Sequence, residues 1–576
     1  LCSIATLLAA CGGSDDPAPS APPTAEVPPI PQLAAATPGT FAGDCTTLAT
    51  ALAGVAPQTT ITLAQTVAAG TVGGAATGEH CRITGRMNER TSPVDGNTYA
   101  IGFEMRAPKA WNGRFFYQAN GGTDGTVSTA TGAIGGAGAT ETALSRGFAV
   151  LSSDAGHSGA GPAFGRDPQA RLDYGYNAVA QLTPMAKNML RLIYGKAPDR
   201  SYFGGCSNGG RHAMVAASRF ADQYDGILAG NAGFNLPTSA VAQLWGAQQF
   251  GTVATATTTV SVPSPGGGST MQTFPNIQTA FTTAELDVVG AAVLARCDAL
   301  DGATDGAVED TRACQAAFDL ERDVPTCAGA RDGTCLSAAQ KTVLQRIYAG
   351  VRNTAGQALY ADWPFDPGIR GSGWRQWKFS NSVNLSPGAT AFIFTTPPQP
   401  DPAAFSGLAY AMGFNVDTDA PKVYGTDATY TQAPMTFMTP PASNLSTLRT
   451  RGAKLMIYHG VSDPTFSFND TVAWYQRQRN LAVGDVNDFA RLYPVPGMNH
   501  CSGGPATDRF DMLGPLVAWV EQGVAPDRVL ASARAANTEL PPSWSATRTR
   551  PLCPWPKVAR YAGSGDVESA DSFQCQ

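Results

Sequence analysis

The stretch SYFGGCSNGGR, residues 201–211, combines a short apolar run, a glycine-rich corner and the start of a helical segment that continues to about residue 220. Within it, Gly205, Ser207 and Gly209 fit the pattern G-x-S-x-G, which places a serine on a strained strand-to-helix turn with its hydroxyl exposed. The helix N-terminus favours negative charge beside that hydroxyl. The pattern fits a nucleophilic serine, and it also fits a glycine-rich turn with a solvated serine.

The histidines narrow the search for a general base that could serve Ser207. The chain has five of them, at positions 80, 157, 212, 459 and 500. Enzymes with this turn carry the acid and then the base after the serine, which excludes the first two. His212 lies five residues beyond Ser207 on the helix that leads away, so we expect a surface or packing residue there.

Two predicted strands in the second half of the chain, residues 454–460 and 489–495, are each followed by a loop with a candidate partner for Ser207. The first loop carries Asp463 and the second carries His500. Loops at the carboxyl edge of a parallel sheet converge on one site. We therefore predict a catalytic triad of Ser207, Asp463 and His500, with His459 supporting the loop of Asp463.

An oxyanion hole needs two backbone N–H groups, one from the residue after the nucleophile and one from an earlier loop. Asn208 would supply the first. The glycine-rich segment NGGTDG, residues 120–125, follows a predicted strand and would supply the second through Gly122. A glycine-rich hairpin tip is the other interpretation of this segment.

The chain contains 12 cysteines. Without Cys2 and Cys11 of the N-terminal segment, the remaining cysteines are even in number, as disulfides require. No C-x-x-C pair is present, so disulfides are favoured over a zinc site. Short loops close at low entropic cost, which favours the pairs Cys297 with Cys314, Cys327 with Cys335, and Cys553 with Cys575. If Ser207 and His500 are in hydrogen-bond contact, their neighbours Cys206 and Cys501 lie close enough to form a bridge, unless their positions are a coincidence.

The N-terminal residues 1–10, LCSIATLLAA, are apolar and too short to span a bilayer, as expected of a truncated signal peptide. The sequence LAAC resembles a bacterial lipoprotein signal, which would make Cys11 the lipid-modified residue; an ordinary signal peptide is the alternative. Residues 11–36 are rich in proline and predict an extended linker. The protein is expected to be exported, and folded from near Thr37.

Length and charge exclude several classes of function. The chain has 576 residues and a formal net charge of −6, from 39 Lys and Arg against 45 Asp and Glu. Without a basic block or stripe, nucleic acid is a poor candidate partner. More than two hundred residues separate the strand ending near residue 230 from the strand beginning at residue 454, which is too long for a loop. An inserted domain is therefore predicted.

Five motifs carry a resemblance to a known family: WNGRFF at 111–116, DPQARL at 167–172, GCSNGGR at 205–211, YHGVSD at 458–463 and PGMNHCSGG at 496–504. From about Cys45 to Cys575 the chain resembles the tannase and feruloyl esterase family of α/β-hydrolases, and within it the bacterial hydrolases of terephthalate monoesters. The resemblance implies an α/β-hydrolase fold, with a catalytic domain at 37–230 and 444–576 and a lid domain at 231–443. It also implies the same triad, the four disulfides above and a fifth between Cys45 and Cys81.

The acidic segment CDALDGATDGAVED, residues 297–310, places Asp298, Asp301 and Asp305 among glycines. Carboxylates clustered in a tight turn suit Ca²⁺, although the spacing is not that of an EF-hand. An acidic, solvated turn fits the same pattern. The family resemblance favours a structural calcium site, formed by these three side chains and the carbonyl groups of Ala303 and Ala307.

Aromatic residues of the predicted lid indicate which kind of substrate the site accepts. Trp377 and Phe394, with Phe466 beside Asp463, resemble family positions that line an aromatic acyl pocket, although core packing would also explain them. In the terephthalate monoester hydrolases a lid arginine holds the free carboxylate, whereas residues 379–421 here contain neither Arg nor Lys. Arg375 or Lys378 could substitute.

Together these features predict an exported serine carboxylester hydrolase that cleaves small aromatic esters through an acyl-enzyme on Ser207. Mono(2-hydroxyethyl) terephthalate, cleaved to terephthalate and ethylene glycol, is one expected substrate, and feruloyl or galloyl esters are the alternative. A non-catalytic surface binding protein on the same fold is a second class, which has no need of a complete triad. We expect a monomer with calcium and no organic cofactor.

Overall fold

The computed structural model describes residues 27–41, 43–264, 267–441 and 445–576. Within this part of the chain, a nine-stranded sheet has the order β15-β14-β11-β10-β8-β9-β6-β5-β2. Strands β15 to β9 pair in parallel and the remaining three pair antiparallel. The strands are β2 (Thr59–Val67), β5 (His80–Thr91), β6 (Thr98–Pro108), β8 (Arg114–Gln118), β9 (Ala149–Ser153), β10 (Arg200–Cys206), β11 (Gly226–Gly230), β14 (Lys454–Gly460) and β15 (Ala490–Val495).

Both faces of the parallel half are buried, because alternate residues of each strand enter different hydrophobic clusters. Phe203 on β10 belongs to the cluster that includes residues of α3 (Ala178–Tyr194), α4 (Asn208–Arg219) and α16 (Phe468–Leu481), while its neighbour Tyr202 belongs to the cluster that includes residues of α17 (Leu513–Gln522). Strands buried on both faces need near-continuous apolar sequence. This arrangement explains the apolar run at 454–460, and the α/β fold class predicted from the sequence is confirmed.

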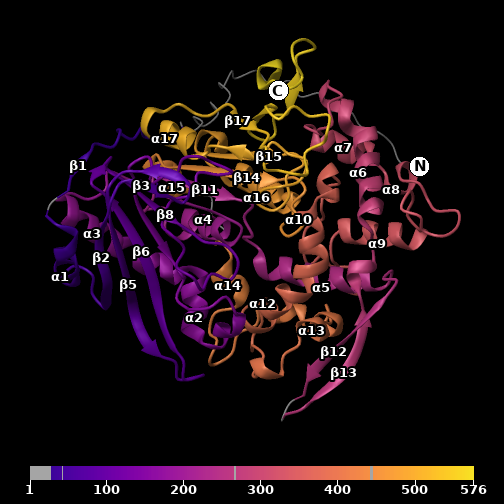
Figure 1. Cartoon of the computed structure of the whole chain (residues 1–576), viewed down its shortest axis with the longest axis horizontal. Coiled ribbons are helices and arrows are strands. Elements are labelled where there is room, and N and C mark those ends of the chain that lie inside the picture. Colours follow the sequence, from indigo (N-terminus) through magenta and orange to yellow (C-terminus); the bar gives the residue numbers. More distant parts are fainter. Residues whose placement is uncertain (1–26, 42, 265–266, 442–444) are drawn as a thin grey trace, which may run out of the picture.

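The long segment 231–443 leaves the sheet after β11 and returns near β14, its parallel neighbour. It forms the helical region on the right and in the lower middle of Figure 1, with a hydrophobic cluster drawn from residues 242–379. Its helices are α5 (Leu236–Gly251), α6 (Thr283–Cys297), α7 (Thr311–Ala317), α8 (Leu320–Asp323), α9 (Ala338–Tyr348), α10 (Ser372–Arg375), α11 (Ser382–Asn384), α12 (Ser386–Phe392), α13 (Gly407–Gly413) and α14 (Pro434–Met438); the hairpin β12 (Thr257–Pro263) and β13 (Ser269–Pro275) projects from it. A π-helical turn, η7 (Gln376–Asn381), carries Trp377.

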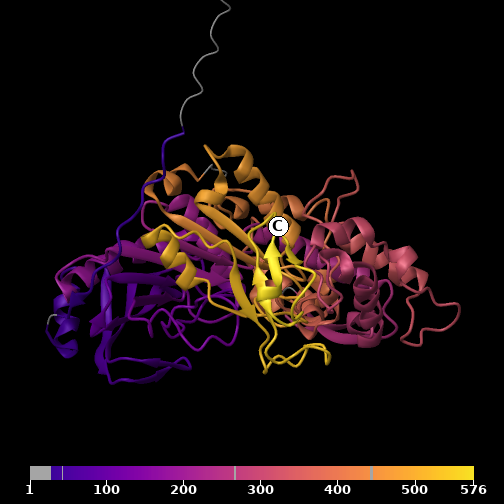
Figure 2. The ribbon, with the colours of Figure 1, turned by 90° about the horizontal axis from the view of Figure 1, so that it is seen from above.

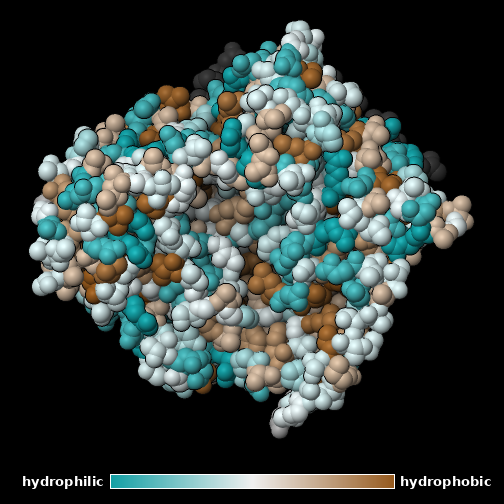
Figure 3. Space-filling view, in the orientation of Figure 1, coloured by the Kyte–Doolittle hydropathy of each residue, from teal (hydrophilic) through white to brown (hydrophobic). Residues whose placement is uncertain are grey.

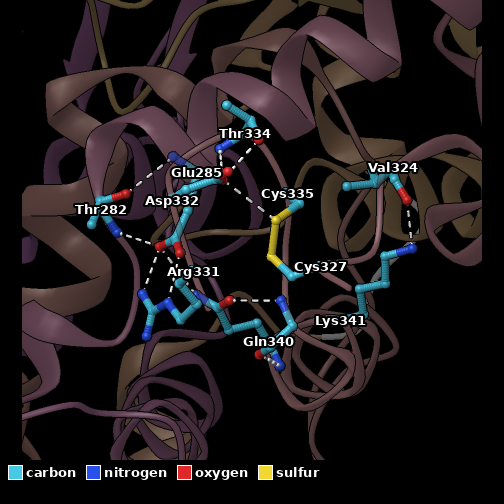
Figure 4. Close-up of a disulfide and its surroundings, with 11 residues drawn as sticks. Thr282, Glu285, Val324, Cys327, Arg331, Asp332, Thr334, Cys335, Gln340 and Lys341 are labelled. Atoms are coloured by element: carbon cyan, nitrogen blue, oxygen red, sulfur yellow. Dashed lines mark hydrogen bonds and ion pairs between the residues drawn. A yellow bond between two sulfur atoms is a disulfide. The ribbon is translucent and has the colours of Figure 1, made fainter. Parts of the chain in front are cut away.

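A buried ion pair organises one end of this helical region (Figure 4). Glu285 accepts two hydrogen bonds of 2.6 Å from Arg331 and one of 2.8 Å from the N–H of Thr282, at the start of α6. Burial raises the pKa of Glu285, but these donors outweigh it and hold the pKa below its ordinary value. The Cys327–Cys335 bond lies beside this ion pair and closes the loop that carries Arg331.

Smaller elements complete the fold. They are β1 (Gly39–Thr40) with β7 (Ala110–Trp111), β3 (Gly70–Val72) with β4 (Ala75–Thr77), β16 (Arg509–Phe510) with β17 (Val529–Ser532) and β18 (Thr549–Leu552), β19 (Ala559–Tyr561) with β20 (Phe573–Cys575), and the helices α1 (Leu48–Ala53), α2 (Pro168–Leu172) and α15 (Ser446–Arg451). Figure 2 shows the C-terminal segment, in yellow, between the sheet and the helical region. Arg560 of this segment contacts Leu300.

All five predicted disulfides are present. They join Cys45 to Cys81, Cys206 to Cys501, Cys297 to Cys314, Cys327 to Cys335, and Cys553 to Cys575. Such a set is typical of proteins that fold in an oxidising compartment, which is consistent with export.

The predicted signal peptide and Cys11 lie outside the described residues. The predicted linker is described from residue 27, and here it is docked rather than free. The side chain of Gln32 donates to the carbonyl oxygen of Val520, and the N–H of Ala36 donates to Glu521. Among the described helices, none combines the length and the apolar character needed to cross a membrane.

Candidate active site

Ser207 lies at the corner between β10 and α4, with φ 66° and ψ −125°. A non-glycine residue with positive φ is strained and is held there by its surroundings. The neighbouring glycines permit the corner, because a Cβ on Gly205 or on Gly209 would lie 2.5 Å from the carbonyl oxygen of Ala119. The corner therefore directs the Ser207 hydroxyl outward from the carboxyl edge of the sheet.

The three residues predicted as a triad form one hydrogen-bonded chain. The distance from His500 Nε2 to Ser207 Oγ is 2.7 Å, and from His500 Nδ1 to Asp463 Oδ2 it is 2.8 Å. Asp463 follows β14 and His500 follows β15, so adjacent parallel strands deliver both side chains to the same edge. This is the geometry in which an imidazole can take the proton of a serine while a carboxylate orients it.

The carboxylate of Asp463 is fully buried and held by several donors. Its Oδ1 accepts hydrogen bonds from the N–H groups of Thr465 and Phe466, at 2.8 and 3.0 Å, and its Oδ2 accepts one from the side chain of Asn231 at 2.7 Å. Burial raises the pKa of Asp463, but the His500 imidazole and the hydrogen bonds from His459 and His500 outweigh it and hold the pKa far below its usual range. Asp463 is therefore ionised at neutral pH.

His459 supports the Asp463 loop. Its Nε2 lies 3.0 Å from the carbonyl oxygen of Phe466, and its Nδ1 lies 2.9 Å from the hydroxyl of Thr471. These contacts use both ring nitrogens, and they tie the loop to helix α16 behind it.

The Cys206–Cys501 bond joins the residue before Ser207 to the residue after His500, with a Cα–Cα distance of 6.1 Å. It crosslinks the segments that carry Ser207 and His500, and its two cysteines are 295 residues apart in the sequence. A covalent bond between their sequence neighbours thus helps to set the distance between Ser207 and His500.

Replacing Cys206 and Cys501 together by alanine is expected to lower kcat/KM about tenfold, because small misplacement of a nucleophile and base slows reaction strongly. Replacing Cys553 and Cys575, which lie in the C-terminal segment, is expected to change kcat/KM less than about twofold. Steady-state kinetics on the folded fraction of each variant would check this. Equal losses in the two variants would contradict a special role for the first bond.

The two predicted oxyanion-hole residues, Gly122 and Asn208, line the same cavity as Ser207. Asn208 is the first residue of α4, so its N–H belongs to the unpaired donors of a helix start. The carbonyl oxygen of Gly122 accepts a hydrogen bond from the Tyr174 hydroxyl, and the Asn208 side chain donates to Asp124 at 2.7 Å. The second bond joins the loop to the start of α4, and the first joins the loop to Tyr174.

His212 is buried and belongs to this supporting network rather than to the surface. Its Nε2 lies 3.0 Å from Asp124 Oδ2. Burial, with the Arg211 charge as a second cause, holds the pKa of His212 well below its ordinary value, so the ring is neutral. His212 therefore acts as a packing residue behind Asn208.

Three aromatic residues that the sequence singled out, Trp377, Phe394 and Phe466, all line the Ser207 cavity. The rings of Trp377 and Phe466 pack edge-on against His500, with centroid distances of 4.8 and 5.2 Å. Figure 3 shows that the face of Figure 1 is hollowed near its middle. The remaining lining residues are Thr123, Tyr174, Leu236, Ser239, Ala240, Gln243, Leu385, Ser386, Ala389 and Thr465.

Sequence reasoning missed those ten residues. Four of them, at 236, 239, 240 and 243, share one face of α5, a spacing that is visible in the sequence. That spacing identifies one face of the helix but not the structure against which this face lies. Only the tertiary fold brings α5 to the Ser207 cavity.

The described lining of this cavity contains no charged side chain. Arg375 donates to the carbonyl oxygen of Phe281 and packs on Phe379. Lys378 is buried with its Nζ 4.1 Å from the ring centroid of Trp363, and burial lowers its pKa to about 7. Neither cation lines the cavity, so the structure does not place either one as a carboxylate clamp.

The acidic turn at residues 298–307 is closed by its own backbone. Asp298 accepts hydrogen bonds from the N–H groups of Asp305 and Gly306, and Asp301 accepts one from that of Ala303. Burial, with repulsion from the neighbouring carboxylates as a lesser cause, raises the pKa of Asp301 to about 7. The charges of these carboxylates therefore interact within one short turn.

Asp305 is also paired with Arg550. Within the described ranges, no group of three or more Asp, Glu, His or Cys side chains converges as a metal-binding set. The calcium site at Asp298, Asp301, Ala303, Asp305 and Ala307 therefore stays a prediction.

A serine at a strand-to-helix corner, with a histidine and a buried carboxylate at the carboxyl edge of a mostly parallel sheet, defines the α/β-hydrolase class. The chain belongs to the tannase and feruloyl esterase family, whose model matches residues 81–576, and it is a carboxylic ester hydrolase.

Known proteins resemble nearly the whole chain. Mono(2-hydroxyethyl) terephthalate hydrolase of Piscinibacter sakaiensis is 42% identical over 546 residues, covering 88% of this chain and 86% of that protein. The crystal structure of feruloyl esterase B from Aspergillus oryzae matches with a TM-score of 0.70 at 23% identity, covering 92% of this chain and 99% of the other. Tannin acyl hydrolase from Aspergillus niger matches with a TM-score of 0.64 at 20% identity, covering 94% and 98%. The two structures support the fold.

Proposed function

We propose that this protein hydrolyses small aromatic esters that carry no free carboxylate on the ring, through an acyl-enzyme on Ser207. The observation that carries the proposal is the cavity at Ser207, which has aromatic walls at Trp377, Phe394 and Phe466 and a described lining without charge. An apolar, aromatic cavity favours a ring, and the absence of a cation leaves a carboxylate without a partner.

The reaction follows from the geometry. Ser207 Oγ forms a bond to the ester carbonyl carbon while His500 Nε2 takes its proton, and Asp463 stabilises the imidazolium. The carbonyl oxygen becomes an oxyanion that accepts from the N–H groups of Gly122 and Asn208. Collapse of this intermediate breaks the bond to the alcohol, which leaves with the proton from His500. Water then attacks the acyl-enzyme by the same steps and releases the acid.

The 42% identity to a mono(2-hydroxyethyl) terephthalate hydrolase favours a second candidate, in which that charged monoester is the substrate. The two candidates differ in charge and are separated by kcat/KM for this monoester, its neutral methyl-capped analogue, methyl ferulate and methyl gallate. We expect the best neutral ester to exceed the charged monoester at least about tenfold, because an unpaired buried charge is costly. A strong preference for the charged monoester would contradict the neutral cavity.

We further propose a structural Ca²⁺ at Asp298, Asp301 and Asp305, with the carbonyl groups of Ala303 and Ala307. The support is the repulsion between these buried carboxylates within one short turn, which a divalent cation would relieve. The turn lies apart from Ser207: none of these residues lines the described cavity.

Removing calcium with a chelator is expected to lower Tm by about 3–8 °C, since a ligand that binds only the folded state stabilises it. Initial rates at low temperature are expected to stay nearly unchanged. Thermal denaturation with and without added Ca²⁺ checks this, with Mg²⁺ as the control ion. An unchanged Tm would contradict the site, and a collapse of the rate without unfolding would contradict a structural role.

Export, lipid modification at Cys11 and a monomeric state complete the proposal. The five disulfides support export, and the sequence LAAC supports the lipid.

A further inference from the structure

The loop that carries Gly122 passes directly beside the corner of the nucleophile. A Cβ built on Gly121 would lie 3.7 Å from the Cβ of Ser207. The N–H of Asp124 donates to the carbonyl oxygen of Gly121 at 3.2 Å, so these two residues close a tight turn that contains Gly122. Within the described part of the chain, the Gly122 N–H has no hydrogen-bond acceptor. The turn therefore presents an unpaired donor next to Ser207, as an oxyanion hole requires.

The backbone of this turn is held in a conformation that few side chains adopt. Asp124 has a φ of 56°, in the left-handed region, which aspartate tolerates better than most residues. The next residue, Gly125, anchors the end of the turn, because its N–H donates to the carbonyl oxygen of Asp154 and its carbonyl oxygen accepts from the N–H of Gly159, at 3.0 and 2.8 Å. A strained residue persists only where its surroundings hold it, and such residues cluster at functional sites.

The side chain of Asn208 connects this turn to helix α4. Its Nδ2 donates to Asp124 Oδ2 at 2.7 Å, and its Oδ1 accepts from Arg211 Nε at 2.6 Å. Because a guanidinium can only donate, these two partners fix the orientation of the Asn208 amide. Asn208 and Asp124 are both buried. The residue whose N–H is the second oxyanion donor is therefore tied by its side chain to the turn that carries the first donor.

We propose that Asp124 is a positioning residue for the oxyanion hole. Its bond to Asn208 sets the distance between two donors, the N–H groups of Gly122 and Asn208, that come from separate segments of the chain. Asp124 itself does not line the described cavity, so it acts only through these donors. Donors stabilise an oxyanion best when they are held in place before the charge develops. This inference rests on the proposed function, since it concerns the oxyanion of the same reaction.

The test uses variants that break the Asp124–Asn208 bond from either side. Asn208→Ala removes the side-chain donor and leaves the backbone N–H in place. Asp124→Gly removes the acceptor, and glycine adopts the positive φ without strain. Asp124→Asn keeps an acceptor oxygen and tolerates the same φ. The double variant Asp124→Gly with Asn208→Ala completes a double-mutant cycle, which isolates the contribution of the bond.

The matched control is a second aspartate–asparagine pair. Asn235 Nδ2 lies 3.0 Å from both carboxylate oxygens of Asp470, and neither residue lines the described cavity. Asn235→Ala and Asp470→Ala therefore break a similar contact without touching the oxyanion donors.

Three quantities are measured on the folded fraction of each variant, which thermal melts define. They are kcat and KM for one neutral aromatic ester, and the inhibition constant of 2,2,2-trifluoroacetophenone. The serine oxygen adds to the carbonyl carbon of this ketone, its proton passes to the histidine, and the ketone oxygen becomes an oxyanion. The inhibition constant therefore reports on the oxyanion hole, whereas a residue that only stabilises the fold would change Tm and leave it unaltered.

Asp124→Gly and Asn208→Ala are each expected to lower kcat at least about tenfold and to keep KM within about threefold, because misplaced donors weaken transition-state stabilisation more than substrate binding. The inhibition constant of the ketone is expected to rise by the factor that kcat/KM falls. The double variant is expected to stay within about threefold of Asn208→Ala, since both changes break the same bond. Asp124→Asn and the control pair are expected to keep kcat within about threefold of the wild type.

A kcat within about twofold of the wild type in both single variants would overturn the proposal, even if Tm fell. Losses that multiply in the double variant, or equal losses in the control pair, would overturn it as well. If Asp124→Gly does not fold, Asn208→Ala measured against Asp124→Asn and the control pair decides the question. Absence of ester hydrolysis by the wild type would instead overturn the proposed function, and this assignment with it.

Discussion

Replacing Ser207 with alanine is expected to lower kcat for ester hydrolysis by roughly 10⁵-fold or more, the size of loss seen when the nucleophile of such a triad is removed. The physical reason is that the Ser207 hydroxyl, 2.7 Å from His500 Nε2, is the group that would attack the ester. The remaining groups could still bind the ester and its oxyanion, but they could not form the acyl-enzyme. Steady-state kinetics on a chromogenic aromatic ester would measure the loss.

Ser218→Ala is the matched control for that variant. Ser218 lies on the same helix α4, where its hydroxyl only donates to the carbonyl oxygen of Met214. It is expected to keep kcat within about twofold, because a helical serine bonded to its own backbone contributes little. If Ser207→Ala retained more than about 1% of the wild-type kcat, Ser207 would not be the nucleophile.

Replacing Asp463 with asparagine is expected to lower kcat about 10⁴-fold, because an amide facing His500 Nδ1 stabilises the wrong imidazole tautomer and no longer balances the imidazolium. Asp463 Oδ2 accepts from His500 at 2.8 Å and is fully buried. Steady-state kinetics with a neutral aromatic ester would measure this loss of kcat.

Asp470→Asn is the control for this change. Asp470, on α16, is another largely buried carboxylate, and it accepts hydrogen bonds from Asn235. A loss for Asp470→Asn as large as that for Asp463→Asn would indicate a general effect of charge removal rather than a role for the triad.

The low pKa of Asp463 also determines how this residue's contribution to stability changes with pH. Because its folded pKa lies below the unfolded value of about 3.9, Asp463 contributes stability that is complete above that value and is lost as pH falls through the folded pKa. It stays ionised throughout the range in which imidazoles titrate. Activity lost on mild acidification therefore cannot come from Asp463.

The triad could be predicted from the sequence because its signals are local. The corner at Ser207 needs glycines on both sides, and the order of acid and base along the chain follows the order of the strands. With five histidines in the chain, few assignments were possible. Cys206 and Cys501 then followed from the predicted contact of their neighbours.

The lining of the cavity could not be predicted in the same way. Gln243 and Thr465 come from helix α5 and a loop, and only tertiary packing brings them together at the Ser207 cavity. The same limit applied to Arg375 and Lys378, since their sequence positions near Trp377 did not reveal that neither residue lines the described cavity.

The most direct test of the central claim is to trap the covalent enzyme with an aromatic fluorophosphonate and locate the adduct by peptide mapping. After reduction of the Cys206–Cys501 bond, trypsin cleavage at Arg200 and Arg211 releases SYFGGCSNGGR, which contains Ser207 and one other serine, Ser201. The predicted result is one adduct per folded chain on Ser207, absent from Ser207→Ala and from unfolded protein. No adduct on folded protein, or an adduct on another serine, would contradict an acyl-enzyme mechanism at this site.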